Sequence, residues 1–306
     1  MTGPVAGSHH RSRVVGRRWV TPHILRLTVD GADDLSGTAS TDAHVAVYFY
    51  PPEARIPERF VAEELTALHE FATPQVRRYT VHRVDPEAGT VEFDVVVHDP
   101  AGLASSRLTA LSVGDELLWW GPTQFWSLPE GATTLLLLGD ETALPAIDAI
   151  LTGLPEAVTA RVVAEVADGT DEVYLADHAD RSPQVEITWV HRGSPDGTVC
   201  PAFVTALEDL AGEFGDATDG PVALWAGHEF ASAAAVRRIF LRDPRSASEG
   251  TPGMALTKQE ATVTSYWIHG QAQDARPDAR NRARNLEARA ARPAEAARHL
   301  RHRSAK

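Results

Sequence analysis

The stretch Arg77-Arg78-Tyr79-Thr80 combines residue types that suit a flat, phosphorylated ligand. An arginine fork matches a pyrophosphate, and a neighbouring aromatic side chain suits a flat ring system. Because side chains alternate along a strand, Arg77 and Tyr79 would face one way and Arg78 and Thr80 the other. Four residues are a short motif, and the alternative is an ordinary polar strand edge. Other parts of the chain must decide between these interpretations.

Two further segments have residue types that could bind a phosphate or a nucleotide. Gly102 and Ser105 lie where a helix is expected to begin, and the backbone N–H groups of a helix N-terminus attract anions. The alternative is a serine that simply caps the helix. Residues 139–145, Gly-Asp-Glu-Thr-Ala-Leu-Pro, follow a predicted strand at the edge where doubly wound sheets bind nucleotides. They do not form a G-x-G-x-x-G fingerprint, so the spacing alone also fits a capped turn.

The first part of the chain predicts a small closed β-barrel. A helical pattern lies between Pro51 and Pro74, and a short helix is expected from Gly102 to about Leu111. Strands are expected at residues 13–20, 23–29, 44–50, 78–84, 90–98 and 116–120. Six short strands with so little helix favour a barrel over a sandwich. His9 and His10 precede these strands and are expected in a mobile terminus.

From residue 133 onward, strands alternate with helices, which predicts a doubly wound parallel sheet. The apolar run at residues 134–138 is typical of a parallel strand that is covered on both faces. Further strands are expected at 160–166, 185–190, 222–226 and 262–268, with helices at 141–151, 202–214 and 230–242. We therefore expect a barrel domain at 12–128, an α/β domain at 132–270, and a basic Ala/Arg-rich tail, helical or disordered, at 271–306.

Composition excludes several classes of function. The chain carries a net charge of −13. Its part from residue 271 onward is basic, with ten Lys/Arg and four Asp/Glu, so the preceding residues are strongly acidic. An acidic surface repels the phosphates of nucleic acid, which is therefore a poor partner. A single cysteine, Cys200, excludes an internal disulfide framework and a cysteine-held iron–sulfur cluster. We see no signal peptide and no apolar run near the roughly 20 residues that span a bilayer. We expect a cytosolic protein with no membrane span and leave its oligomeric state open.

A barrel followed by a nucleotide-type sheet suits hydride transfer to a flavin held between the domains. Over residues 12–270 the chain resembles the siderophore-interacting proteins, flavin-dependent ferric-siderophore reductases of the ferredoxin-reductase-like superfamily. The resemblance is carried by residues 77–80, 98–105, 138–146, 225–227 and 265–267, and Gly-Asp-Glu-Thr-Ala-Leu-Pro-Ala is its most specific segment. The chain departs from the family pattern at three places. His82 stands where a basic residue is usual, and His228 stands where the family usually has a Gly-Glu pair. Ile268 takes the place of a Lys or Arg.

The resemblance implies non-covalent FAD, an NAD(P)H electron donor, and a ferric siderophore that is reduced to release Fe(II). The siderophore supplies the iron ligands, so no metal ligands from the protein are expected. Thr80 and Thr142 are the candidate catalytic residues, Thr142 near the place where nicotinamide meets flavin. The implied cofactor-binding residues are Arg77, Arg78, Tyr79, Thr80, Val81, His98, Gly102, Ala104, Ser105, Asp140, Thr142 and Ala143.

An anionic ferric siderophore needs basic side chains beside the flavin, because distant charges are screened beyond about 8–10 Å at physiological salt. The candidate cations are Arg55, Arg59 and Lys258, with Tyr266 and Trp267 as an aromatic wall. The alternatives are an exposed loop lysine and a core role for the aromatic pair. Ile268 replaces one cation that the family pattern would supply.

Acidic residues dominate the segment 165–172, which follows the second strand of the predicted sheet. Carboxylates near the nucleotide ribose would repel a 2′-phosphate and favour NADH, although Arg161 and Arg192 could reverse this preference. Two other functions remain open. One is a reductase of the same fold with a free-flavin or quinone acceptor, and the other is a siderophore-binding module with a vestigial flavin.

Overall fold

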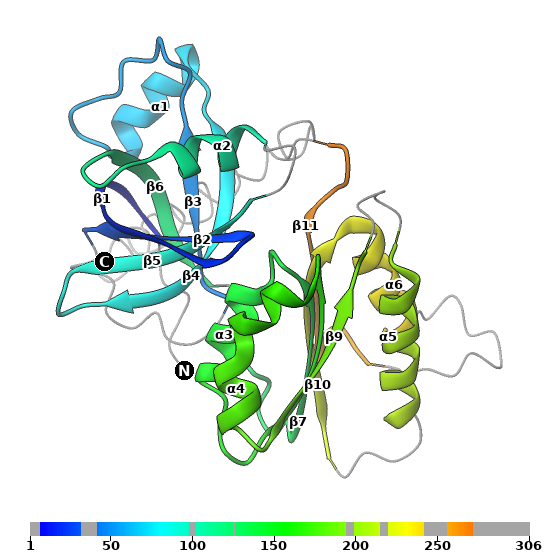
Figure 1. Ribbon diagram of the computed structural model, residues 1–306. Helices are drawn as coiled ribbons and strands as arrows, with labels where there is room; N and C mark the ends of the chain where they lie inside the picture. Colours follow the sequence, from blue (N-terminus) through cyan, green and yellow to red (C-terminus); the bar gives the residue numbers. More distant parts are fainter. Residues whose placement is uncertain are drawn as a thin grey trace, which may run out of the picture.

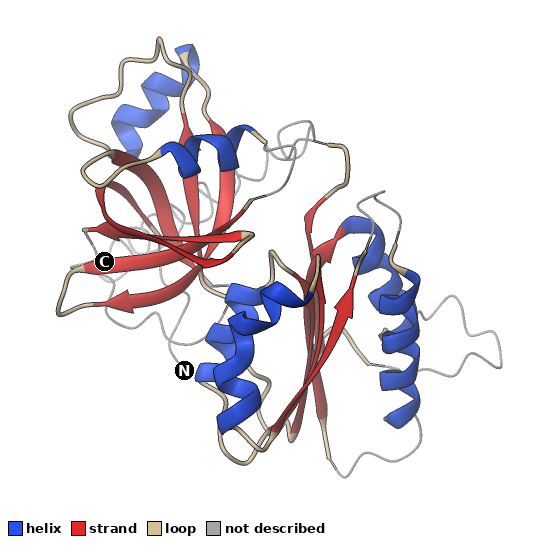
Figure 2. Cartoon of the chain, viewed as in Figure 1, coloured by secondary structure: helices blue, strands red, loops and turns tan. Residues whose placement is uncertain are grey.

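The computed structural model describes residues 7–31, 42–97, 102–124, 126–193, 199–214, 220–241 and 256–271. They form an N-terminal β-barrel beside a C-terminal parallel sheet that carries helices on both faces (Figures 1 and 2). The candidate residue His98 and the predicted tail from residue 272 onward lie outside the described residues. Within the described parts, no helix is both long and apolar enough to cross a membrane.

Six antiparallel strands close the barrel in the order β1-β2-β5-β4-β3-β6, which confirms the predicted architecture. Alternate residues of each strand fill the interior, among them the fully buried Val45, Val47, Phe93 and Trp119. The strands are β1 (Ser8–Thr21), β2 (Ile24–Asp30), β3 (His44–Phe49), β4 (Gln75–Asp85), β5 (Thr90–Val96) and β6 (Glu116–Thr123).

The expectation that His9 and His10 lie in a mobile terminus is wrong. Both belong to β1, which begins at Ser8 and pairs with β6 from the outset. The His10 ring stacks on Trp119 with centroids 3.9 Å apart, and burial first, then the neighbouring His69, lowers the pKa of His9 to about 4. Pairing with β6 holds this segment in the barrel wall.

Two helices pack on the barrel. α1 (Ala62–Phe71) buries Leu65 against Tyr50 and Phe60, and Figure 1 shows it at the end of the barrel away from the second domain. α2 (Leu103–Ala110) adds Leu108 to the barrel core.

The second domain is a parallel sheet, as predicted, and its strands lie in the order β11-β10-β7-β8-β9. Its apolar strand β7 is covered on both sides, because Leu135 and Leu137 pack in one layer and Leu136 and Leu138 in the other. Figure 1 shows α3 and α4 on the barrel side and α5 and α6 on the opposite side. The elements are β7 (Thr134–Asp140), α3 (Leu144–Thr152), β8 (Thr159–Val166), η1 (Gly169–Leu175), α4 (Ala176–Arg181), β9 (Val185–His191), α5 (Pro201–Glu213), β10 (Val222–Glu229), α6 (Phe230–Phe240) and β11 (Ala261–Trp267).

Side-chain contacts join the two domains. A buried ion pair in the barrel, Arg26–Asp94 at 2.7 Å, meets the Tyr174 hydroxyl of η1. Two barrel histidines reach carboxylates of the second domain, each at 2.9 Å: His23 contacts Asp171 and His82 contacts Asp148. The barrel wall that carries β4 therefore faces α3 and the sheet.

Candidate functional site

The candidate site lies where the outer face of β4 meets the carboxyl ends of β7, β10 and β11. Thr80 of β4 hydrogen-bonds Tyr266 of β11 through their side chains. Two residues further along β4, His82 contacts Asp148 of α3. Alternate residues of this strand thus turn toward the second domain, as the geometry of a strand requires. The interface brings the Arg-x-Tyr-Thr segment against the nucleotide-type edge of the sheet.

The neighbouring residues of β4 lie on both of its faces. Tyr79 packs against the barrel core, with its ring 5.8 Å from Phe93, and burial raises the pKa of its hydroxyl. Arg77 is half-buried and donates to the Val76 carbonyl at 2.9 Å. Arg78 is exposed, and its side chain shares a face with Thr80. This strand therefore offers one guanidinium on each of its faces.

The start of α2 has the features of an anion site. Its N-cap, Gly102, is exposed and extended, and no side chain of the described residues caps the helix. The Ser105 hydroxyl instead donates to the Gly102 carbonyl at 3.1 Å, while Ala104 is buried in the barrel core. The serine-cap alternative is therefore wrong. Within the described parts of the chain, no side chain caps the first N–H groups of α2, which suits a phosphate.

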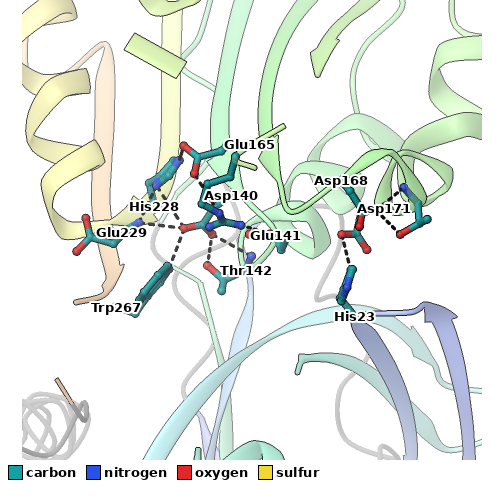
Figure 3. A network of polar contacts seen from close by, with 12 residues as sticks. His23, Asp140, Glu141, Thr142, Glu165, Asp168, Asp171, His228, Glu229 and Trp267 are labelled. Atoms are coloured by element: carbon teal, nitrogen blue, oxygen red, sulfur yellow. Dashed lines mark hydrogen bonds and ion pairs between the residues drawn. The ribbon is translucent and has the colours of Figure 1, made fainter. Parts of the chain in front are cut away.

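Asp140 lies at the carboxyl edge of the sheet, where its carboxylate accepts several hydrogen bonds (Figure 3). This fully buried carboxylate accepts hydrogen bonds from the backbone N–H groups of Thr142 at 2.9 Å and Glu229 at 3.0 Å. The Thr142 hydroxyl and the Trp267 indole N–H, the latter at 2.8 Å, also donate to it. Burial alone would raise the pKa of Asp140, but His228 and these donors lower it. The carboxylate therefore fixes the turn before α3 and ties three strands together.

A second layer of charge lies behind Asp140. His228, at the end of β10, is 3.3 Å from Asp140 through Nδ1 and 3.5 Å from Glu165 through Nε2. Arg192 follows β9 and contacts Glu165 at 3.5 Å and the buried Glu141. Burial would lower the pKa of His228, but the facing carboxylates raise it. These groups form a buried network in which His228 and Arg192 each lie between two carboxylates.

Two glycines allow neighbouring side chains to pack closely against the strands at this edge of the sheet. A Cβ on Gly139 would lie 2.5 Å from the Cβ of Ala143, at the start of α3. A Cβ on Gly227 would lie 2.9 Å from the Tyr266 ring. The glycines of the Gly-Asp-Glu-Thr and Trp-Ala-Gly segments therefore let the helix and the Tyr266 ring approach the strands closely.

The candidate cations for an anionic acceptor lie in different parts of the molecule. Arg55 and Arg59 are exposed in the segment before α1, which Figure 1 shows at the far end of the barrel. Lys258 is exposed in the turn before β11, at the amino edge of the sheet, because Ala261 pairs with Leu224 near the start of β10. Trp267, by contrast, lies at the carboxyl edge beside Asp140.

Asp140 and Trp267 are candidate residues in the sequence, but the network that links them could not be predicted from it. Glu165, Arg192 and His228 come from the ends of β8, β9 and β10. The feature of the sequence that could have pointed to this network was His228, which departs from the family pattern. Only the strand order brings it beside Asp140 and Glu165.

A closed antiparallel barrel joined to a parallel nucleotide-type sheet is the ferredoxin-reductase-like fold. The chain superimposes on the ferredoxin NADP+ reductase of Neisseria gonorrhoeae with a TM-score of 0.57 and 14% identity, covering 84% of this chain and 98% of that one. At this identity the likeness shows the fold alone. The chain belongs to the siderophore-interacting protein family: the models for the siderophore-interacting FAD-binding domain and the siderophore-interacting protein match residues 13–126 and 132–270.

Two similar proteins carry informative names. The structure of a siderophore utilization protein from T. fusca aligns with a TM-score of 0.66 and 28% identity, covering 88% of this chain and 96% of that one. The ferric vibriobactin reductase of Vibrio cholerae is 26% identical over 263 residues, covering 85% of this chain and 90% of the reductase. Together with the FAD-binding domain, these likenesses support a siderophore-related flavoprotein and an oxidoreductase.

Proposed function

We propose that this protein uses NAD(P)H to reduce a ferric siderophore through bound FAD, in the cytosol, and so releases Fe(II). The observation that carries the proposal is the hydrogen bond between Thr80 and Tyr266. It joins the predicted flavin-binding strand to the sheet edge that Asp140 and Trp267 organise. An electron donor at that edge and a flavin on β4 would thus be neighbours. The matched siderophore-interacting family supports the acceptor class.

The residues around this interface fit FAD. Exposed Arg78 and half-buried Arg77 offer cations to a pyrophosphate, and the uncapped start of α2 offers N–H groups to a phosphate. Thr80 and the backbone of Val81 would contact the ring system from β4, with Tyr79, Ala104 and Ser105 completing the pocket. FAD, when bound, accepts electrons in pairs from a nicotinamide and passes them on singly.

The protein's part at the sheet edge is to shape the nicotinamide site. Asp140 holds Thr142 through both its N–H and its hydroxyl, so the turn with Ala143 is rigid. We place the nicotinamide against this turn. Side chains that are already in place would hold the nicotinamide and flavin rings in a fixed relative orientation, so that the protein need not rearrange during electron transfer.

We also propose a preference for NADH. Both arginines that could favour a 2′-phosphate are already paired, Arg192 with Glu141 and Glu165, and Arg161 with Glu186. Of the acidic segment, Asp168 remains exposed where a carboxylate would repel the phosphate. A kcat/KM for NADPH that equals or exceeds the value for NADH would contradict this preference.

The chemistry of release follows from charge. Hard oxygen ligands hold Fe(III) more tightly than Fe(II), because the higher charge attracts them more strongly. A one-electron reduction of the bound siderophore complex therefore weakens the chelate. The relative from Vibrio cholerae, a ferric vibriobactin reductase, supports an acceptor of this kind.

An anaerobic stopped-flow experiment tests the proposal. Bound FAD should lose its visible absorbance when NADH is added and recover it when a ferric siderophore is added, while an Fe(II) chelator reports released iron. Recovery with quinone or free flavin but not with siderophore would favour the same-fold reductase. No bleaching by either NADH or NADPH, with siderophore still bound, would favour a binding module.

A further inference from the structure

Three side chains that commonly bind metals meet at the domain boundary, away from Asp140 (Figure 3). His23 lies in the turn between β1 and β2 of the barrel, whereas Asp168 and Asp171 belong to the start of η1 in the second domain. One potential ligand atom from each residue lies within 4.8 Å of the other two. The sequence had led us to expect no protein metal ligands.

Asp171 gives the strongest sign of a missing partner. Its side chain is 0% exposed, and Oδ2 lies 2.9 Å from Nδ1 of His23. The other oxygen, Oδ1, is buried and has no hydrogen-bond partner among the described residues. Leaving a buried carboxylate oxygen unpaired is costly, and structures rarely do so without a reason. The carboxylate therefore has capacity for one more positively charged group.

Asp168 is positioned to complete the set from the solvent side. Its Oδ1 accepts hydrogen bonds from the N–H of Thr170 at 2.8 Å and from the Thr170 hydroxyl at 2.6 Å, which orient the carboxylate. Because Asp168 is exposed, it can adjust its position, and an ion can enter from its side.

We propose that His23, Asp168 and Asp171 bind one divalent first-row transition-metal ion, with Zn²⁺ as the representative, and that the ion clamps the two domains together. One imidazole and two carboxylates are ordinary ligands for such ions. Bonds of about 2.0–2.2 Å at tetrahedral angles place neighbouring ligand atoms about 3.3–3.6 Å apart. His23 Nδ1 and Asp171 Oδ2, now 2.9 Å apart, would need to separate only by roughly half an ångström to share an ion. The ion would also supply a partner to Asp171 Oδ1, the oxygen that has none among the described residues.

Binding would displace the proton that His23 and Asp171 share, since a metal-bound imidazole nitrogen must be deprotonated. Asp168 would then close onto the ion by a small movement. The ion would join the β1–β2 turn of the barrel to η1. This inference does not rest on the proposed reduction of a siderophore. Of the three residues only Asp168 has a role there, in the proposed preference for NADH, and the metal titration reads ion binding whether or not that preference holds.

The competing explanation is a plain ion pair between His23 and Asp171, and metal titration distinguishes the two. The full-length FAD-bound protein is stripped with a chelator, dialysed, and titrated with Co²⁺ by visible absorbance and with Zn²⁺ by calorimetry. We expect one tight equivalent. The variant Asp168→Asn, at an exposed position that should not disturb folding, is expected to weaken binding at least about tenfold, as the loss of one ligand predicts.

His82→Gln is the matched control. His82 is also a barrel histidine that lies 2.9 Å from a carboxylate of the second domain, Asp148, but it is outside the three-residue cluster. This variant should bind metal as the unmodified protein does. Zn²⁺ should also raise the Tm of the stripped protein by several degrees, and not that of Asp168→Asn. Absence of a saturable equivalent, or equal weakening in both variants, would overturn the proposal.

Discussion

Trp267 donates its indole N–H to Oδ2 of Asp140 at 2.8 Å, and this bond joins the last strand of the sheet to its central strand at the nucleotide edge. Asp140 is fully buried and collects three further donors from Thr142 and Glu229. A buried carboxylate is stable only when its oxygens are well supplied with donors or positive charge. The shape of the edge on which the nicotinamide is proposed to rest therefore depends on Trp267.

Trp267→Phe should lower the free energy of unfolding by about 1–3 kcal/mol, because it removes one donor from a buried charge and keeps an aromatic ring. Urea denaturation measures the loss. A double-mutant cycle with Asp140→Asn isolates the bond, since the two losses should not be additive if Trp267 and Asp140 are coupled. Additive losses would contradict a special role for this bond.

The His228 imidazolium should make stability depend on pH. Burial lowers the pKa of His228, but Asp140 and Glu165 raise it further, so the folded-state pKa lies above the ordinary value of 6.5. A raised folded-state pKa means that the stabilisation is fully present below pH 6.5. It is lost as the pH rises through the folded-state value.

The variant His228→Gln, which cannot titrate, tests this sign. The difference in unfolding free energy between the unmodified protein and the variant should be largest below about pH 6.5 and shrink as the pH rises above it through the folded-state pKa. His191→Gln is a useful comparison, because His191 forms an exposed pair with Glu172 and such pairs contribute little. A difference that grows with pH would show that His228 is neutral in the folded protein.

Most of the fold could be predicted from local patterns. The barrel strands alternate, and the run of residues 134–138 is apolar because both faces of β7 are covered. The prediction missed η1 and α4, since Gly169–Leu175 and Ala176–Arg181 are short and carry many polar residues. Tyr174 and Leu175 are buried there through contacts that only the folded chain provides.

The site was less accessible to prediction. Asp140 and Thr142 stand in a recognisable segment, so their place at the sheet edge followed from the sequence. The pairing of His228 with Glu165 did not, because these residues are 63 positions apart and meet only through the strand order. No short spacing could have encoded that contact.

The buried ion pair between Arg26 and Asp94 should be costly to break from one side. Arg26→Met leaves the Asp94 carboxylate uncompensated beside Tyr174 and should destabilise the protein by about 3–5 kcal/mol. The double variant Arg26→Met with Asp94→Leu removes both charges and should recover part of that loss. Denaturation midpoints in urea compare the three proteins. A double variant that is less stable than the single one would refute this account.

Arg77 is predicted to anchor FAD. Arg77→Ala should weaken FAD binding by about ten- to over a hundredfold, or roughly 1.5–3 kcal/mol, the worth of a charge-assisted contact. Flavin fluorescence titration of the apoprotein measures the affinity. Arg83→Ala, which removes an exposed arginine of the same strand that lies 3.6 Å from Asp85, should leave it unchanged. If Arg78→Ala loses FAD and Arg77→Ala does not, the anchoring guanidinium is the one on the Thr80 face.

The last prediction concerns the acceptor site, where Arg59 and Lys258 are the cations to separate. Lys258 precedes β11 at its amino end, and the seven residues of this strand, about 20 Å in length, separate it from Trp267. At physiological salt, charges are screened beyond about 8–10 Å, so Lys258→Ala should leave the siderophore KM unchanged. Arg59→Ala should raise it if the acceptor binds on the barrel side, with NADH-driven flavin reduction unaffected in both variants. A raised KM in Lys258→Ala would move the acceptor to the amino edge of the sheet, and no change in either variant would exclude both cations.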